Sequence, residues 1–261
     1  METEKIGRHT VEFYGDIKEL PVVRFQTYQK LLLIDAGIGG DIASVDKRLE
    51  RTRRFLMAGQ PKEAERELEN LRQCIFLVQS SVLPKHRAFA ALVTKIDGES
   101  FAEVTEAGLD RVTELLKDAP VGEVDAAMRA AKKKIEDDLL LYFPAVFNTG
   151  ASREYFGLLR ARALAILRGI TEGTEHPAGT QEVEDITTRM ATLDEPRVFN
   201  GPNGIEVQTD RNFEDVCLVL SEQLHINPKT CTVFEYYNAY EFMQRRAKEA
   251  EKARKSGLNR R

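Results

Sequence analysis

The first residues that suggest chemistry form a glycine-rich segment after an apolar run. Residues 31–40 read LLLIDAGIGG, in which an aspartate and three glycines follow four aliphatic side chains. A strand leading into such a loop would point backbone N–H groups at a phosphate. However, the spacing is not GxGxxG and no βαβ pattern follows. We therefore predict that Gly37, Gly39 and Gly40 end a helix and that Asp41 caps the next one.

Other catalytic or metal-binding patterns are weak. The chain has no GxSxG motif, and none of its cysteines has a recognisable histidine partner in the local sequence. Acidic runs such as residues 136–138 (EDD) lack a histidine at ligand spacing and are typical of a solvated helix face. The histidines are isolated: His9, His86, His176 and His225. We predict no catalytic residue, no cofactor and no metal site, and hence a protein that is not an enzyme.

The C-terminal segment, residues 232–255, predicts a helix that binds a partner. Thr232 and Glu235 form a capping box at its start. One face carries an apolar stripe, whereas Phe234 and Phe242 lie off that stripe and need a second surface, on another domain or another subunit. The stripe consists of Val233, Tyr236, Tyr237, Tyr240, Met243 and Ala247. The predicted partner-binding residues are Phe234, Tyr237, Phe242, Arg245 and Arg246.

Charge is unevenly distributed along the chain. The 261 residues have a formal charge of −4. Residues 245–261 contain eight Lys or Arg and two Glu, a local charge of +6, which leaves −10 on residues 1–244. A nucleic-acid reader would be expected to have a basic body and a known reading module. Because the body of this chain is acidic, contact between its basic end and a polyanion is kept as the alternative, and protein binding is preferred.

The remaining pattern predicts a mainly α fold. Ile42, Val45, Leu49 and Leu56 recur at helical spacing behind Asp41. After Pro61 the apolar residues repeat by four and three: Ala64, Leu68, Leu71, Ile75, Val78 and Val82. Further helices are predicted at residues 23–34, 89–96, 109–116, 123–142, 155–170, 181–193 and 213–224.

Two domains are predicted on either side of a linker at residues 173–179 (GTEHPAG). Residues 1–172 are predicted to form a helical bundle. Residues 180–261 form a smaller helical unit with one β-hairpin, whose strands are Arg197–Phe199 and Ile205–Gln208 around an Asn- and Gly-rich loop. Three unpaired cysteines predict a reducing compartment. Without a signal peptide or an apolar run of 18 residues, we expect a cytoplasmic protein and no membrane.

Two stretches resemble proteins from the structural and tail-assembly gene clusters of tailed bacteriophages. They are Phe13–Ile42 (FYGDIKELPVVRFQTYQKLLLIDAGIGGDI) and Thr232–Arg246 (TVFEYYNAYEFMQRR). The resemblance implies a small, acidic, mostly helical virion part, or a chaperone that holds other tail proteins before assembly. Its partners would be other phage structural proteins or further copies of the chain. We thus expect a non-enzymatic protein-binding protein. The alternative is a nucleic-acid-associated accessory protein acting through the basic helix.

Overall fold

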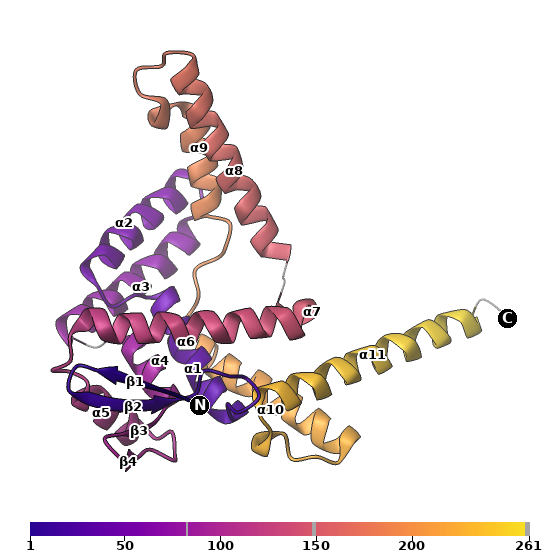
Figure 1. Ribbon diagram of the computed structural model, residues 1–261. Helices are drawn as coiled ribbons and strands as arrows, with labels where there is room; N and C mark the ends of the chain where they lie inside the picture. The colour runs from indigo at the N-terminus through magenta and orange to yellow at the C-terminus, as the bar shows by residue number, and fades with distance from the viewer. Residues whose placement is uncertain (82, 148–149, 259–261) are drawn as a thin grey trace. The chain divides into compact units, whose positions relative to one another are not determined.

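The computed structural model describes residues 1–81, 83–147 and 150–258, and it is mainly α with a small antiparallel sheet (Figure 1). By contacts the chain divides into two compact units, each made of segments that are distant in sequence. Unit 1 contains residues 1–33, 84–147 and 206–261, and unit 2 contains residues 34–83 and 148–205. This grouping differs from the predicted single boundary, since residues 173–179 lie inside unit 2.

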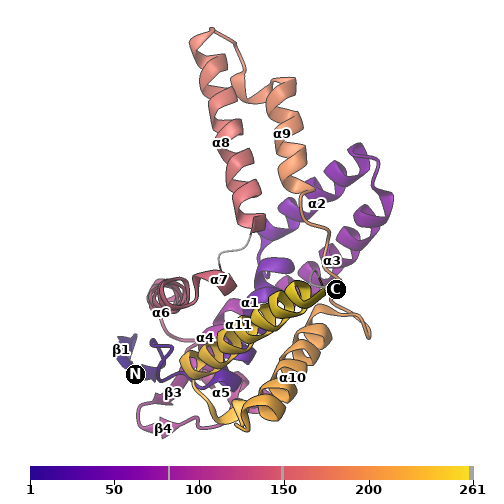
Figure 2. The ribbon, with the colours of Figure 1, turned by 90° about the vertical axis from the view of Figure 1, so that its right-hand side faces the viewer.

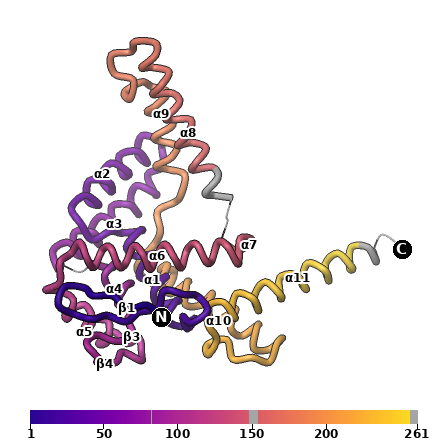
Figure 3. The backbone as a smooth tube through the Cα atoms, in the orientation of Figure 1, coloured from indigo at the N-terminus to yellow at the C-terminus, as the bar shows by residue number. Residues whose placement is uncertain are grey.

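Unit 1 combines the sheet with most of the aromatic residues. Figure 3 traces its three segments along the colour ramp. Its strands are β1 (Glu2–Ile6), β2 (His9–Phe13), β3 (Val93–Ile96) and β4 (Glu99–Ser100). Its helices are α1 (Val22–Gly37, which continues into unit 2), α4 (Pro84–Leu92), α5 (Glu106–Leu115), α6 (Val121–Tyr142), α7 (Pro144–Phe147), α10 (Ile205–Leu224), the short 3₁₀ helix η2 (Pro228–Thr230) and α11 (Val233–Leu258).

The sheet has the order β1-β2-β3-β4, and every neighbouring pair is antiparallel. Gly7, at φ +60°, makes the tight turn between β1 and β2. Alternate residues of β2 (His9, Val11 and Phe13) are buried, as period-two patterning requires. Phe13 meets Phe89 of α4 edge to face, with ring centroids 5.2 Å apart. The sheet therefore anchors the core of unit 1.

Unit 2 is built from helical pairs. Its helices are α2 (Ile42–Met57), α3 (Pro61–Gln79), α8 (Gly150–Thr171), the 3₁₀ helix η1 (Pro177–Gly179) and α9 (Gln181–Ala191). As predicted, α1 ends at Gly37 and Asp41 caps α2, because its carboxylate accepts from the Ser44 N–H at 2.7 Å. Pro61 lies in the first turn of α3, also as predicted. A buried ion pair joins the two helices: Arg48 Nη1 lies 2.7 Å from Glu67 Oε1.

Two predictions about strands were wrong. Residues 205–208 open helix α10 instead of forming a hairpin strand, and residues 197–199 lie in a loop. A four-residue alternation was too short to outweigh the helical repeat of Thr209, Phe213, Val216 and Leu220, which begins at Ile205. The described strands form hairpins elsewhere, β1–β2 and β3–β4. The predicted helix over residues 89–96 is likewise divided, since α4 ends at Leu92 and β3 begins at Val93.

The predicted apolar stripe of α3 is rotated relative to the observed buried face. Leu71 and Ala64 are buried as predicted, but Leu68 and Ile75 are exposed. The polar Glu67 and Asn70 take their place, together with Cys74. The cause lies on α2, because Arg48 and Arg51 supply the charges that allow Glu67 to be buried. Val82, the last residue of the predicted stripe, lies outside the described residues.

Leu71→Ala is expected to lower the free energy of unfolding by about 2 to 5 kcal/mol, because it removes buried methyl groups and leaves a cavity. Chemical denaturation at low protein concentration measures the loss. Leu68→Ala is the matched control in the same helix, and its exposed side chain should cost less than about 0.5 kcal/mol. Equal losses for the two variants would show that the buried face of α3 is assigned wrongly.

Candidate functional site

The start of α11 is fixed to unit 1 by its cap and by backbone hydrogen bonds. The predicted capping box is present: the Thr232 N–H donates to Glu235 Oε2 at 2.9 Å and the Glu235 N–H donates to Thr232 Oγ1 at 3.3 Å. The next two N–H groups, of Val233 and Phe234, donate to the carbonyls of Leu20 and Ile17 at 2.9 and 3.0 Å. The first turn of α11 is thus held against the segment that precedes α1.

Phe234 finds its second surface within unit 1. Its ring meets Tyr142 edge to face at 5.2 Å and Phe143 at 5.7 Å between centroids. Lys18 Nζ lies 5.6 Å from the Phe234 centroid, at cation–π distance. Phe234, predicted to bind a partner, is therefore satisfied by its own chain.

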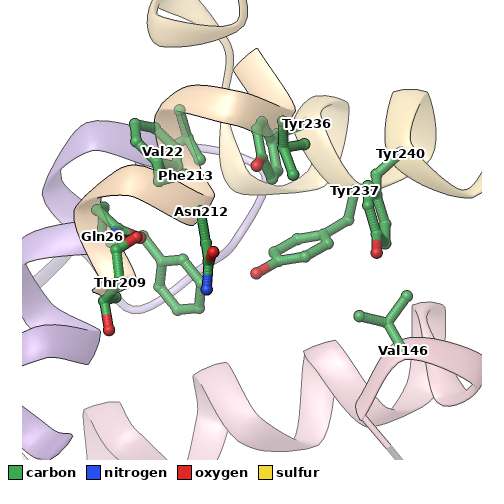
Figure 4. Close-up of a pocket in the computed structure, with 11 residues that line it drawn as sticks. Val22, Gln26, Val146, Thr209, Asn212, Phe213, Tyr236, Tyr237 and Tyr240 are labelled. Carbon is green, nitrogen blue, oxygen red and sulfur yellow. Dashed lines mark hydrogen bonds between the residues drawn. The ribbon is translucent and has the colours of Figure 1, made fainter. Parts of the chain in front are cut away.

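An open pocket of about 290 Å³ lies beside the first half of α11 (Figure 4). Its walls come from four helices of unit 1: α1, α7, α10 and α11. Figure 4 shows the Tyr237 ring and the Asn212 side chain pointing toward each other across it. The lining residues are Val22, Phe25, Gln26, Val146, Thr209, Asn212, Phe213, Val216, Tyr236, Tyr237 and Tyr240. Tyr237, predicted from sequence to bind a partner, is thus a wall of this pocket.

Aromatic rings dominate the pocket, and three of them lie perpendicular to the Tyr237 ring. Tyr237 meets Phe25 at 6.3 Å, Tyr236 at 5.2 Å and Tyr240 at 6.4 Å, each edge to face. Phe213 lies 5.7 Å from Tyr236. Such packing fixes the rings of the wall before any ligand arrives.

The pocket is uncharged. No Asp, Glu, Lys, Arg or His is among the described residues that line it. Burial raises the pKa of the Tyr236 and Tyr237 phenols well above the usual value, so both stay neutral donors and acceptors at physiological pH. Gln26 Nε2 already donates to the Thr209 carbonyl at 3.2 Å. The arrangement suits the capture of an apolar or aromatic group with a few neutral hydrogen bonds.

The second half of α11 leaves the body of unit 1. Every residue from Arg245 to Lys255 is exposed, and Figure 1 shows this part of α11 extending away from α10. It carries six Lys or Arg and two Glu, a charge of +4. We call residues 245–255 the arm. Phe242, at its root, is 42% exposed, and the guanidinium carbon of Arg246 lies 5.8 Å from its ring centroid. Phe242, Arg245 and Arg246 are therefore available to a partner.

Sequence reasoning missed the part of the site that α11 does not supply. Gln26, Thr209 and Asn212 face the pocket from α1 and α10 (Figure 2 shows α10 beside α11). The helical repeat of Phe213 and Val216 predicted an apolar face on α10, but no local signal indicates which helices that face packs against. Two further observations concern other kinds of site. Within the described residues no group of three or more His, Cys, Asp or Glu is placed to hold a metal ion. Among the described helices none has the length and apolarity needed to cross a bilayer.

A scan against protein-family models, a search of curated proteins and a search of solved structures each found no match to this chain.

Proposed function

We propose that this protein is a non-enzymatic protein-binding protein that binds its partner through α11. The observation that carries the proposal is the division of that helix. Its aromatic first half is packed in unit 1 and forms one wall of an open, uncharged pocket, while its second half projects into solvent. A partner side chain that is apolar or aromatic fits the pocket. Phe242 and the arginines beside it extend the contact.

The kind of partner is proposed from the resemblance to tailed-bacteriophage proteins. A virion part or a tail-assembly chaperone binds other structural subunits or copies of itself, which agrees with an acidic body and a basic arm. We place this activity in the host cytoplasm or in the virion. The matching probes are the purified products of the genes that flank the gene for this chain, where capsid, tail-tube or tape-measure genes are expected.

Binding by aromatics predicts that Phe242→Ala weakens the complex with such a flanking gene product by more than about 1 kcal/mol, roughly fivefold or more in Kd. Asn212→Trp, which fills the pocket with a large ring, is expected to weaken it as well. Leu218→Ala is the control, because it also removes a large exposed apolar side chain, on α10. This variant should bind as the wild type does. Sedimentation velocity measures the complex, and circular dichroism checks that helicity is unchanged.

One observation favours nucleic-acid binding as a second function, namely the exposed arm with its charge of +4. Under that function, replacing Lys248, Lys252 and Lys255 with Gln would remove binding to a 20-base-pair duplex, and affinity would fall steeply with salt. Replacing Lys117, Lys132 and Lys133, which are exposed elsewhere in unit 1, is the charge-matched control. If Phe242→Ala binds like the wild type and only the arm variant loses a partner, the protein-binding proposal is wrong.

A further inference from the structure

The α2–α3 hairpin of unit 2 has one covered face and one bare face. The covered face packs against α9 and the segment after it. On α2, Arg51 Nε donates to the Ala191 carbonyl at 3.0 Å, and Arg54 Nη1 pairs with Glu184 at 3.0 Å. On α3, Asn70 Nδ2 donates to the Arg197 carbonyl at 3.1 Å. At 100° per residue, the residue two positions before each of these lies about 160° away, on the opposite face. Those residues are Leu49 and Leu68, which are both exposed, and Thr52, which is buried.

The bare face is apolar over the whole hairpin. Five large aliphatic side chains on it are between 39% and 74% exposed: Ile42, Leu49, Leu56, Leu68 and Ile75. On α2 the exposed residues recur every seven positions, with the partly buried Val45 and the buried Thr52 between them. On α3, Leu68 and Ile75 belong to the four-and-three repeat noted above. Both helices thus present an exposed apolar stripe, which we call a seam, at the a positions of a heptad pattern, beside d positions that are partly or fully buried.

The centres of the two seams lie at the same level of the hairpin. The ion pair between Arg48 and Glu67, at 2.7 Å, fixes the alignment of α2 with α3. The residues that follow these two, Leu49 and Leu68, therefore stand side by side in the middle of the bare face. Figures 1 and 2 both show α2 and α3 running side by side in opposite directions.

Charges flank both seams in the same order. Asp46 and Arg53, on α2, take the e positions three before and four after Leu49. Glu65 and Arg72, on α3, take the e positions three before and four after Leu68. All four side chains are exposed on the outer edge of the bare face. In antiparallel helix pairs e positions meet e positions, so each acid would meet the base of an identical helix.

This charge pattern selects a second copy of the chain as the occupant. A two-fold axis across the helices, level with Leu49 and Leu68, places α2 antiparallel to α2 and α3 antiparallel to α3. It sets Asp46 opposite Arg53 of the partner subunit and Glu65 opposite Arg72 of the partner subunit. It also sets Ile42 opposite Leu56 of the partner subunit. A parallel, in-register pairing would instead bring equal charges level with each other.

We propose that the bare face is the interface of a homodimer in which two α2–α3 hairpins form an antiparallel four-helix bundle. The proposal does not depend on the function of α11. Helices of 16 and 19 residues are about 24 to 28 Å long, and packed neighbours lie about 8 to 10 Å apart. The resulting footprint is at the low end for stable interfaces, so we expect a reversible dimer with a Kd on the order of micromolar.

Sedimentation equilibrium of the full chain tests the interface. Between about 1 and 100 µM, a range that spans such a Kd, the wild type should pass from monomer to dimer. Leu49→Asp puts a charge at the centre of the seam and should weaken the dimer at least about tenfold. Leu218→Asp, at an exposed site of unit 1, should leave dimerisation unchanged. Circular dichroism of each variant confirms that the fold persists.

A charge exchange tests the two-fold arrangement itself. Arg53→Asp should weaken the dimer, because Asp46 of each subunit then faces an aspartate, and adding Asp46→Arg should restore it. Arg53 also pairs with Glu50 at 3.2 Å within its own helix, and that contact is lost in both variants, so it does not account for a rescue. A chain that stays monomeric at every concentration overturns the proposal, as does a dimer insensitive to Leu49→Asp, or a double variant no better than Arg53→Asp alone.

Discussion

Arg24→Met is expected to lower the free energy of unfolding by about 3 to 5 kcal/mol. Arg24, on α1, is buried, and its guanidinium donates to main-chain carbonyls of two segments. Nη1 donates to the carbonyls of Ala91 and Val93 at 3.1 and 2.9 Å, and Nη2 donates to those of Phe101 and Ala102. Methionine fills a similar volume but leaves these acceptors unpaired, at about 1 to 3 kcal/mol for each that is buried.

Burial lowers the pKa of the Arg24 guanidinium from its ordinary value, but arginine stays charged at physiological pH. The charge is spread over donors that a single ammonium does not reproduce, so Arg24→Lys should recover only part of the loss. Arg111→Met is the control, since Arg111 is exposed and its Nε forms a surface ion pair with Glu99 at 3.6 Å. Such a pair contributes little, so the control should lower the free energy of unfolding by less than about 0.5 kcal/mol. Urea denaturation measures all three variants. An Arg24→Met loss as small as that of Arg111→Met would show that the carbonyl network does not hold α1 in place.

Elements whose signals are local were predicted from the sequence. The cap at Asp41, the proline in the first turn of α3 and the capping box at Thr232 each depend on residues within one helical turn. Long helices such as α6 were also predicted, because their periodic pattern extends over many turns. The mainly α fold follows from these elements.

Features that depend on distant neighbours were not predictable in the same way. Residues 93–96 form a strand because β2, some 80 residues earlier, pairs with them. Glu67 is buried because Arg48 lies across the hairpin. The pocket has the same origin, since Tyr237 was found from its own helix while Asn212 and Val146 reach the site through the fold. The sequence pattern alone did not separate the packed Phe234 from the exposed Phe242.

The buried ion pair of unit 2 is expected to behave differently when one partner or both are replaced. Glu67 is fully buried, with Arg48 at 2.7 Å, Arg51 at 3.7 Å and the Asn70 amide at 3.5 Å. Glu67→Leu leaves the Arg48 guanidinium without its carboxylate, and should cost about 3 to 5 kcal/mol. The double variant Glu67→Leu with Arg48→Met removes both charges and keeps the volume. It should therefore be more stable than Glu67→Leu alone.

A double-mutant cycle measured by urea denaturation gives the coupling energy of the pair. The cycle is run at protein concentrations below the expected Kd of the dimer, so that association adds nothing to the unfolding free energy. We expect a coupling above about 1 kcal/mol, because each single variant leaves a charge that the other had neutralised. Additive losses would mean that Arg51 and the Asn70 amide, not Arg48, stabilise the Glu67 carboxylate. In that case the alignment of Leu49 with Leu68 would lose its anchor, and the two-fold pairing of the hairpins would lose its geometric basis.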